Sequence, residues 1–567
     1  MKILGVHYSH DSGAAIIEDG KILAAVNEER LVRKKSYWGF PTQSLKNIFN
    51  LAGVKPGEID FVAFANITPG GGPQKGFGKP NLRKKTMDMV ANNLPFLIGS
   101  NFFIKNYRFF TSKLRKGKSI VNYIRQLGVT APIEFIEHHE CHAASVFYTS
   151  PFDKDTLVVT TDGTGDGYCA TSSIVNNDLS LKRVATTPFF HSPASIYAYT
   201  TYNLGFTPNK HEGKLTGLAA YGEPDKTYPI YEKIMKVKNT QYKTSSLGWG
   251  RPGSKKLHML MQAQKREDIA AGLQKRTEKV CSELIANTLK KHKRANIALS
   301  GGIFANVKVN QKIAEIPGVE KIYIHPHMGD GGLAVGAALS LWSQKTLDQG
   351  KQPKPIPINN TYFGPGFSNE EIEEELKKSN IKYKYHDNVE QEIAHLLKDK
   401  KIIGRFNGRM EYGPRALGNR SILADPTDKK INDWLNKRLK RTEFMPFAPS
   451  LMEEHAEDFY KNFNKGKIAA QFMTITFDVK KEGAEKAQAV SHIDNTARPQ
   501  TVNKEQNESY YNILKSYNDL TGLPIFVNTS FNMHEEPIVC SPFDAIRAFK
   551  LGSVDNLAIG NFICNLK

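Results

Sequence analysis

One pattern that occurs four times restricts the fold more than any other feature: an apolar, strand-like run meets a turn rich in glycine. It lies at residues 9–27, 155–175, 295–315 and 321–342. The first copy surrounds Asp19-Gly20, a type I′ turn signal that predicts a β-hairpin. In the last two copies a helical pattern follows the glycines, and such strand ends are where α/β proteins place nucleotide phosphates. The pattern therefore predicts an α/β fold with a nucleotide site.

The chain has 567 residues, which is too long for one hydrophobic core and implies at least two domains. We expect a first domain over 1–345 and a second, alternating α/β domain over 361–567. The stretch 346–360 contains three prolines, a glycine and two lysines, which is typical of a linker.

Composition narrows the class of protein. Hydrophobic residues make up 40% of the chain, enough for large cores, and no run of 18 apolar residues predicts a membrane span. The N-terminus lacks a cleavable signal pattern because His and Asp residues interrupt its apolar run. The five cysteines are scattered with no C-x-x-C pair, which is typical of reduced thiols. We therefore expect a cytoplasmic protein without a membrane anchor.

The formal net charge of +20 is concentrated in two segments. Residues 75–118 carry +10 and residues 225–266 carry +8, and both contain aromatic side chains. Two local basic surfaces favour a polyanionic partner such as DNA, because phosphates and stacked bases suit basic and aromatic side chains. Two solvated lysine-rich loops would give the same pattern, and a paired basic loop could equally face a second subunit in a homodimer.

Residues 134–145, "EFIEHHECHAAS", hold three of the chain's histidines. His138 and His142 are four residues apart, on one face of a predicted helix that follows a strand-like run, so they can share one metal ion. Asp162 and Asp330 each lie at a strand end in a glycine-rich turn, where they could supply further ligands. Such a set suits iron, zinc or manganese. Alternatively, each aspartate stabilises its own turn.

At this point the sequence resembles the NodU/CmcH-type O-carbamoyltransferases. The matching stretches, in order, are 9–35, "HHECHAAS" (138–145), "HEGKLTGLAAYGEP" (211–224), "SGGIFANVKVN" (300–310), "GDGGLAVGAA" (329–338), "GRMEYGPRALGNRSILADP" (408–426), "MPFAPS" (445–450), "HIDNTARPQTV" (492–502) and "VNTSFNMHEEPIVCSPFDA" (527–545). Nine ordered matches along the whole chain make coincidence implausible.

The resemblance implies an actin-like ATPase fold (ASKHA) for the N-terminal domain, related to the threonylcarbamoyl-transfer proteins that modify tRNA, and a YrdC-like C-terminal domain. It also implies that the C-terminal domain makes carbamoyl adenylate from carbamoyl phosphate and ATP, with Mg²⁺ accompanying ATP. The metal-holding N-terminal domain would then pass the carbamoyl group to an acceptor hydroxyl.

Carbamoyl phosphate is a small dianion, and a cluster of guanidinium groups is well suited to bind it. The stretch 408–421 supplies three arginines within twelve residues, interleaved with apolar side chains as in a lined pocket. The predicted carbamoyl-phosphate residues are Arg409, Arg415, Arg420, Lys440, Arg441, Arg498, Asn528 and Ser530. Relatives often have an arginine before "PFAP", where this chain has Met445, so this anion contact differs or another base replaces it.

The N-terminal domain must bind a nucleotide and accept a proton from the acceptor hydroxyl. The residues that match the family's nucleotide loops, or lie in the glycine-rich turns, are Ser12, Gly163, Gly165, Glu212, Lys214, Gly217, Gly301, Gly302, Asn306 and Gly331. His10 is the candidate general base, because an unperturbed pKa of ~6.5 suits that role. Asp11 could orient its ring, and Lys35 could contact a phosphate or carbamoyl oxygen. A purely structural role for His10 is the alternative.

The acceptor is not specified by these motifs. The family suggests a small-molecule or glycan alcohol, and the basic segments favour a hydroxymethylated pyrimidine in nucleic acid as the runner-up. Two further alternatives are a sugar-kinase-like or ATP-driven switch, which would leave the arginine-rich stretch unexplained, and a tRNA threonylcarbamoyl-transfer protein.

Overall fold

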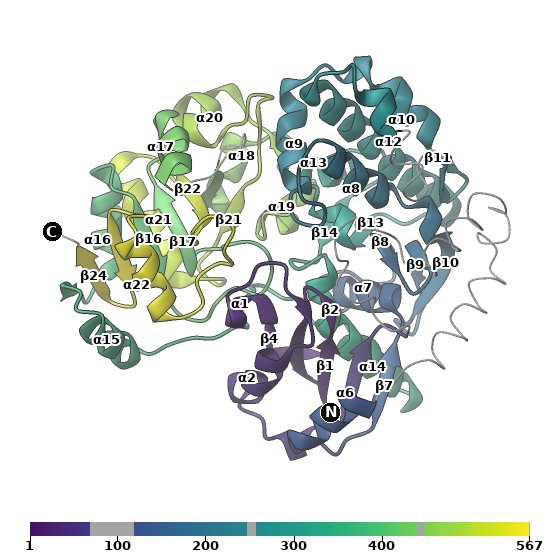
Figure 1. Ribbon diagram of the computed structural model, residues 1–567, viewed down its shortest axis with the longest axis horizontal. Helices are drawn as coiled ribbons and strands as arrows, with labels where there is room; N and C mark the ends of the chain where they lie inside the picture. The colour runs from purple at the N-terminus through teal and green to yellow at the C-terminus, as the bar shows by residue number, and fades with distance from the viewer. Residues whose placement is uncertain (68–117, 246–256, 439–446, 566–567) are drawn as a thin grey trace. The chain divides into compact units, whose positions relative to one another are not determined.

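The computed structural model describes residues 1–67, 118–245, 257–438 and 447–565 (Figure 1). The chain divides into two compact units. The first contains residues 1–25 and 36–357, and the second contains residues 26–35 and 358–567. The short segment 26–35 therefore leaves the first unit and belongs to the second, which nothing in the sequence led us to expect.

The first unit is built on two five-stranded sheets with the same topology. One has the order β4 (Lys21–Asn27), β3 (Gly13–Glu18), β1 (Lys2–His7), β6 (Phe61–Ala65), β7 (Ile133–Ile136). The other has the order β10 (Leu181–Pro188), β9 (Tyr168–Val175), β8 (Thr156–Gly165), β13 (Asn296–Ser300), β14 (Lys321–Ile324). In each sheet the central strand, β1 or β8, pairs antiparallel with the next strand listed before it, β3 or β9. On the other side of the central strand, the remaining two strands are parallel to it. This duplicated order confirms the expected actin-like fold.

Two tight turns form the hairpins of these sheets. Asp19 and Gly20 have φ angles of 47° and 86°, and Asp166 and Gly167 have φ angles of 47° and 94°. Positive φ at both central residues defines the type I′ turn, whose twist matches that of the flanking strands. The hairpin predicted from Asp19-Gly20 is thus confirmed.

A pair of helices packs against the two sheets of the first unit. Helix α14 (Leu333–Asp348) lies on β1, β3 and β6, while α7 (His138–Phe147) lies on β8 and β13, and the two helices pack on each other. They come so close that a Cβ at Gly336 would lie 2.0 Å from the carbonyl oxygen of Cys141. Glycine at this position therefore permits the contact, which holds α7 beside the ends of both sheets.

The remaining elements of the first unit complete its layers. They are β2 (Ser9–His10) paired with β5 (Trp38–Gly39), β11 (Met235–Lys238) paired with β12 (Gln241–Thr244), α2 (Thr42–Ala52), α6 (Lys118–Gln126), α8 (Pro193–Asn203), α9 (Glu212–Leu218), α10 (Tyr228–Ile234), α12 (Arg266–His292) and α13 (Val307–Ala314).

The basic segment 75–118 lies outside the described residues except for Lys118. The described part of the basic segment 225–266 includes α10 and the β11–β12 hairpin. Within the described ranges, no helix is both long and apolar enough to cross a bilayer.

The second unit is α/β, as predicted, and its main sheet has eight strands. Their order is β15 (Tyr383–Tyr385), β24 (Phe562–Asn565), β23 (Asn556–Ile559), β16 (Ile403–Phe406), β17 (Arg420–Ala424), β22 (Ile525–Ser530), β18 (Ala448–Met452), β21 (Gln500–Val502). A short pair, β19 (Phe477–Asp478) and β20 (Thr496–Ala497), lies apart from it. Its helices are α1 (Glu28–Val32), α15 (Asn369–Lys378), α16 (Val389–Lys398), α17 (Lys430–Arg438), α18 (Ala456–Phe459), α19 (Phe463–Ala470), α20 (Lys481–Lys486), α21 (Glu508–Thr521) and α22 (Pro542–Lys550).

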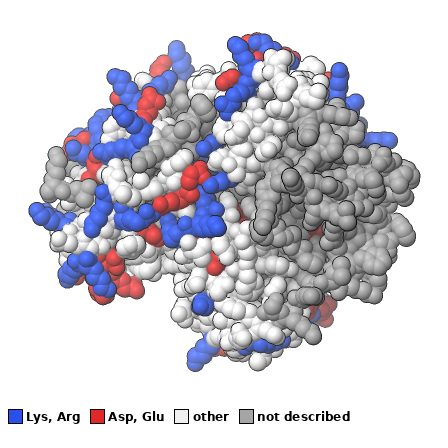
Figure 2. Space-filling model, viewed as in Figure 1, with Lys and Arg blue, Asp and Glu red and all other residues white. Residues whose placement is uncertain are grey.

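The core of the second unit lies between this sheet and the helix pair α16–α21. Ile393 and Leu397 of α16 pack with Ile513 and Tyr517 of α21 over strand residues such as Phe526, all buried. Figure 2 shows both basic and acidic side chains on one face of the molecule. On α15, two lysines form ion pairs with glutamates one turn away. That described surface is therefore mixed in charge rather than uniformly basic.

Candidate functional site

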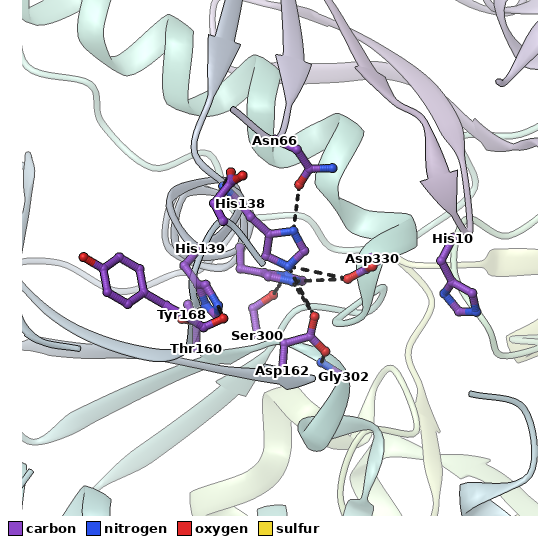
Figure 3. Close-up of polar contacts among 12 residues, drawn as sticks. His10, Asn66, His138, His139, Thr160, Asp162, Tyr168, Ser300, Gly302 and Asp330 are labelled. Carbon is purple, nitrogen blue, oxygen red and sulfur yellow. Dashed lines mark hydrogen bonds and ion pairs between the residues drawn. The ribbon is translucent and has the colours of Figure 1, made fainter. Parts of the chain in front are cut away.

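The histidine-rich stretch forms the start of helix α7, as predicted. The Glu137 side chain caps the helix by accepting from the backbone N–H of Glu140. His138 and His142 are buried one turn apart, and the Nε2 atoms of both lie within 3.8 Å of Asp162 and Asp330. Figure 3 shows His138 beside these two aspartates. His139 turns away and bonds Thr160 Oγ1 through Nδ1 at 2.8 Å, which makes it a structural residue of the core.

Asp162 and Asp330 complete a cluster with this histidine pair. From His138 Nε2 the distances are 3.2 Å to Asp162 Oδ2 and 3.7 Å to Asp330 Oδ1. From His142 Nε2 the corresponding distances are 3.8 Å and 3.6 Å. The structure therefore brings together all four residues predicted as metal ligands.

Hydrogen bonds behind the histidines point their Nε2 lone pairs into this cluster. Asn66 Oδ1 lies 2.8 Å from His138 Nδ1, and an amide oxygen can only accept, so that nitrogen carries the proton. Ser300 Oγ donates to the Met328 carbonyl and lies 3.1 Å from His142 Nδ1, so it accepts from the ring. Both Nε2 atoms are consequently left as acceptors facing two carboxylates.

This arrangement fits a divalent metal ion. Two ligands about 2.1 Å from a tetrahedral ion lie roughly 3.4 Å apart, close to the four distances measured here. His142 Nε2 and Asp330 Oδ1 are buried, and neither forms a hydrogen bond to any described residue. Without an ion, protons must keep the cluster together. Burial by itself lowers the pKa of His138, but Asp162 and Asp330 raise it to about 9.

An irregularity in strand β8 directs the Asp162 side chain toward the cluster. The pairing of β8 with β9 shifts register between Thr161 and Gly165, and such bulges redirect side chains. The Gly302 N–H donates to Asp162 Oδ1 at 3.1 Å, which leaves Oδ2 directed at His138. Asp330 begins the short 3₁₀ turn that leads into α14. The two aspartates thus come from glycine-rich strand ends, as expected from the sequence.

His10 lies to one side of the cluster in Figure 3. It is paired with its neighbour in the chain, Asp11. Its Nδ1 is 3.2 Å from Asp11 Oδ2, so Asp11 does orient the ring. Burial alone would lower the pKa of His10, but the Asp11 carboxylate raises it to about 9. The expectation of an unperturbed pKa is therefore wrong in the metal-free protein, because that carboxylate stabilises the imidazolium. Ser9 and Asp11 both have positive φ, a strained backbone typical of functional sites.

The predicted nucleotide residues occupy several different positions in the first unit. Ser12 is buried between β2 and β3, Gly163 and Gly165 lie at the end of β8, and Gly301, Gly302 and Gly331 lie in the turns after β13 and β14. Glu212, Lys214 and Gly217 lie on α9, and burial raises the pKa of Glu212. Asn306 caps α13 and exchanges hydrogen bonds with Gln274, so its side chain has a structural role.

The arginines predicted to bind carbamoyl phosphate divide into two kinds. Arg420 is fully buried in β17, stacks on Phe406 and donates to four backbone carbonyls, those of Pro365, Asn407, Gly408 and Asn419. Arg409 similarly donates to the carbonyls of Phe363 and Gly364. These bonds hold the loop 407–419 in shape. They indicate a structural role for both residues, while Arg420 Nε is buried without a hydrogen bond to any described residue.

Arg415 and Arg498 differ from that pair. Both are half-buried, and burial lowers the pKa of Arg415 to about 10. Burial, followed by repulsion from Arg415, lowers the pKa of Arg498 well below its ordinary value. Two neighbouring guanidinium groups that are disfavoured in this way would be stabilised by an anion between them.

The remaining predicted residues lie in a strand of the second unit, at its surface, or outside the described residues. Asn528 and Ser530 lie within strand β22 rather than in a loop after it, because pairing with β17 continues to Ser530. Asn528 donates to Ala416, Ser450 and Gln500, while its Oδ1 is buried with no hydrogen bond to the described chain. Lys35 is exposed and groups with the second unit, not with the unit of His10. Lys440, Arg441 and Met445 lie outside the described residues.

Comparison with known proteins decides the family. The model of the carbamoyltransferase N-terminus matches residues 2–339, and that of the carbamoyltransferase C-terminus matches residues 394–565. The chain belongs to the carbamoyltransferase family. The protein sll1178 of Synechocystis is similar to this carbamoyltransferase, with 34% identity over 99% of this chain and 96% of its own. Nodulation protein NolNO of Sinorhizobium fredii has 29% identity over 98% of this chain and 79% of its own.

A solved structure of full-length HypF covers 61% of this carbamoyltransferase and 56% of the HypF chain, with 14% identity and a TM-score of 0.33. A likeness this slight carries no argument. The actin-like assignment rests instead on the strand order of the two sheets in the first unit.

Sequence reasoning missed several residues that shape the sites of this carbamoyltransferase. Asn66 and Asp166 both have positive φ, and both bond His138, Asn66 at its ring and Asp166 at its backbone N–H. Arg30 donates to the Gly413 carbonyl in the second unit. No local pattern marks such residues, because they lie far in the chain from the groups that they hold.

Proposed function

We propose that this carbamoyltransferase makes carbamoyl adenylate in its second unit and transfers the carbamoyl group to an alcohol in its first. The observation that carries the proposal is the cluster of His138, His142, Asp162 and Asp330, whose four acceptor atoms lie within 4.8 Å of one another and could hold one divalent ion. The activation step is supported by Arg415 and Arg498 of the second unit. These neighbouring arginines are not neutralised by any described carboxylate.

The activation step needs one water molecule if its atoms are to balance. Hydrolysis of carbamoyl phosphate would give carbamate and inorganic phosphate. A carbamate oxygen would then attack the α-phosphorus of ATP, forming carbamoyl adenylate and releasing pyrophosphate. Arg415 and Arg498 would hold the phosphate dianion, since guanidinium groups meet phosphate oxygens with paired hydrogen bonds.

In the transfer step the acceptor oxygen attacks the carbamoyl carbon, its proton leaves, and AMP departs. The neutral form of His10, which predominates only above its pKa of about 9, would accept the proton, and Asp11, 3.2 Å away, would stabilise the resulting imidazolium. A divalent cation held by the four-residue cluster would stabilise negative charge that develops on the carbamoyl oxygen. Ser300 and Asn66 keep the two histidines in the tautomer that such an ion requires.

The acceptor that we propose is a small-molecule or glycan alcohol. The alternative, a hydroxymethylated base in nucleic acid, depended on segments 75–118 and 225–266, which lie largely or partly outside the described residues. We therefore carry only the first acceptor class forward.

The test is incubation with ATP, carbamoyl phosphate, Mg²⁺, a divalent metal and a panel of alcohols, followed by mass spectrometry of the alcohols. Replacement of a hydroxyl hydrogen by CONH₂, with equal release of phosphate and pyrophosphate, is expected. Transfer of phosphate to the alcohol without any need for carbamoyl phosphate would contradict the proposal and support a kinase.

A further inference from the structure

The segment 26–35 is fastened to the second unit by two arginines of the stretch "EERLVRKK". It includes the short helix α1, with Arg30 within the helix and Arg33 directly after its last residue, Val32. Arg30 is 5% exposed and Arg33 has a side chain 24% exposed. Two arginines buried to this extent within one turn need specific partners, because a buried charge without them is costly.

Arg33 has several partners within the second unit. It donates to the carbonyls of Pro537 and Ile538 at 2.8 Å and 2.6 Å, and its Nε lies 3.2 Å from Asp544 Oδ1. Asp544 also caps helix α22 by accepting from the N–H groups of Cys540 and Ser541. Arg33 is therefore an anchor that fixes the end of α1 beside the start of α22.

Arg30 has partners for only part of its guanidinium. Its Nη2 donates to the Gly413 carbonyl at 2.7 Å, and its Nε lies 3.1 Å from Glu29 Oε1. Its Nη1 is buried and has no hydrogen-bond partner in the part of the chain that the structure describes. A buried cationic donor left unpaired is unfavourable, and this indicates that an acceptor from outside the chain normally occupies the position.

The bond to Gly413 places this unpaired donor beside the loop that carries Arg415. Gly413 has a φ of 115° and lies two residues before Arg415, so the Arg30 bond fixes a turn that only glycine adopts easily. Arg30 is also among the charges that influence the pKa values of Arg420 and Cys540, which places it in the same cationic surroundings. An unpaired guanidinium donor held against the loop that carries Arg415 suits a phosphate dianion.

We propose that Arg30 is a binding residue of the second unit's anion site, in which Nη2 holds the Gly413 turn and Nη1 donates to the phosphate of carbamoyl phosphate. This inference rests on the proposed function, which assigns that anion to Arg415 and Arg498. It adds that a residue from the N-terminal part of the sequence completes the site, so residues 358–567 alone lack one of its ligands.

The test uses the full-length protein with Arg30→Lys and Arg30→Ala, and Arg438→Gln as the matched control. Arg438 pairs with Asp555 and stacks on Trp434 in the same unit. The readouts are pyrophosphate release from ATP as carbamoyl phosphate is varied, and the rise in melting temperature caused by inorganic phosphate. Both Arg30 variants should raise KM for carbamoyl phosphate roughly tenfold or more, the loss expected for a hydrogen bond to a charged group.

The same variants should keep KM for ATP near the wild-type value and lose the protection by inorganic phosphate. Methylguanidinium should restore part of the activity of Arg30→Ala, which a purely structural role would not predict. If Arg30→Ala does not fold, Arg30→Lys decides, because lysine keeps the charge but cannot serve both partners. Unchanged KM in a folded Arg30 variant overturns this inference alone. A wild-type protein that neither uses carbamoyl phosphate nor responds to phosphate overturns the proposed function itself.

Discussion

Gly165 lies directly against the imidazole ring of His138: a Cβ at position 165 would be 2.0 Å from the Cδ2 atom of that ring. The position of the His138 ring thus depends on the absence of a side chain at the end of strand β8.

Gly165→Ala should therefore displace His138 from the cluster. We expect a loss of bound divalent metal, measured by elemental analysis after dialysis, and a destabilisation of about 1–3 kcal/mol, the usual cost of overpacking a core. Gly163→Ala is the matched control, because no atom lies within 4 Å of a Cβ there. Equal metal contents in the two variants would show that His138 does not hold the ion.

Asn66 should control metal affinity without touching the metal. Replacing Asn66 by Leu removes the acceptor that keeps the proton on His138 Nδ1, and the loss of such a partner typically weakens metal binding 10- to 100-fold. Asn66→Asp keeps an acceptor at this position and should retain most of the affinity. Titration of the metal-free proteins measures this, and an unchanged affinity in Asn66→Leu would refute the role.

The pairing of His10 with Asp11 predicts a pH-dependent stability of the metal-free protein. The folded state raises the pKa of His10 from 6.5 to about 9, so protonation favours folding. The contribution, at most about 3 kcal/mol, should be complete below pH 6.5 and lost as the pH rises through 9.

Urea unfolding of the wild type and of His10→Gln, both treated with a chelator, measures this contribution as a difference. The difference in unfolding free energy should shrink between pH 6.5 and 9. A difference that stays constant over that range would mean that Asp11 does not stabilise the imidazolium.

Arg415 and Arg420 should respond in opposite ways to substitution, although they are five residues apart. Arg420→Lys breaks several bonds to backbone carbonyls and should destabilise the second unit by about 3–5 kcal/mol. Arg415→Ala removes a guanidinium that burial disfavours, so it should leave stability unchanged and raise KM for carbamoyl phosphate. Chemical denaturation and steady-state kinetics separate the two, and a destabilised Arg415→Ala would contradict the division.

The sequence was sufficient wherever structure is determined locally. The Asp19-Gly20 turn, the strand-to-helix joint before His138 and the aspartates at strand ends were all predicted, since turn chemistry and hydrophobic periodicity involve residues close in the chain. The α/β class and the family could also be recognised from the sequence, because each motif that indicates them is one continuous stretch of the chain.

Only the tertiary structure decided how residues far apart in the chain combine. It showed that Arg420 donates to several backbone carbonyls, whereas burial lowers the pKa of Arg415. It also placed Asn66 behind His138, raised the pKa of His10 and brought Arg30 to Gly413, a residue 383 positions away. The physical reason is that hydrogen bonding, burial and electrostatics depend on distance in space, which sequence spacing does not determine.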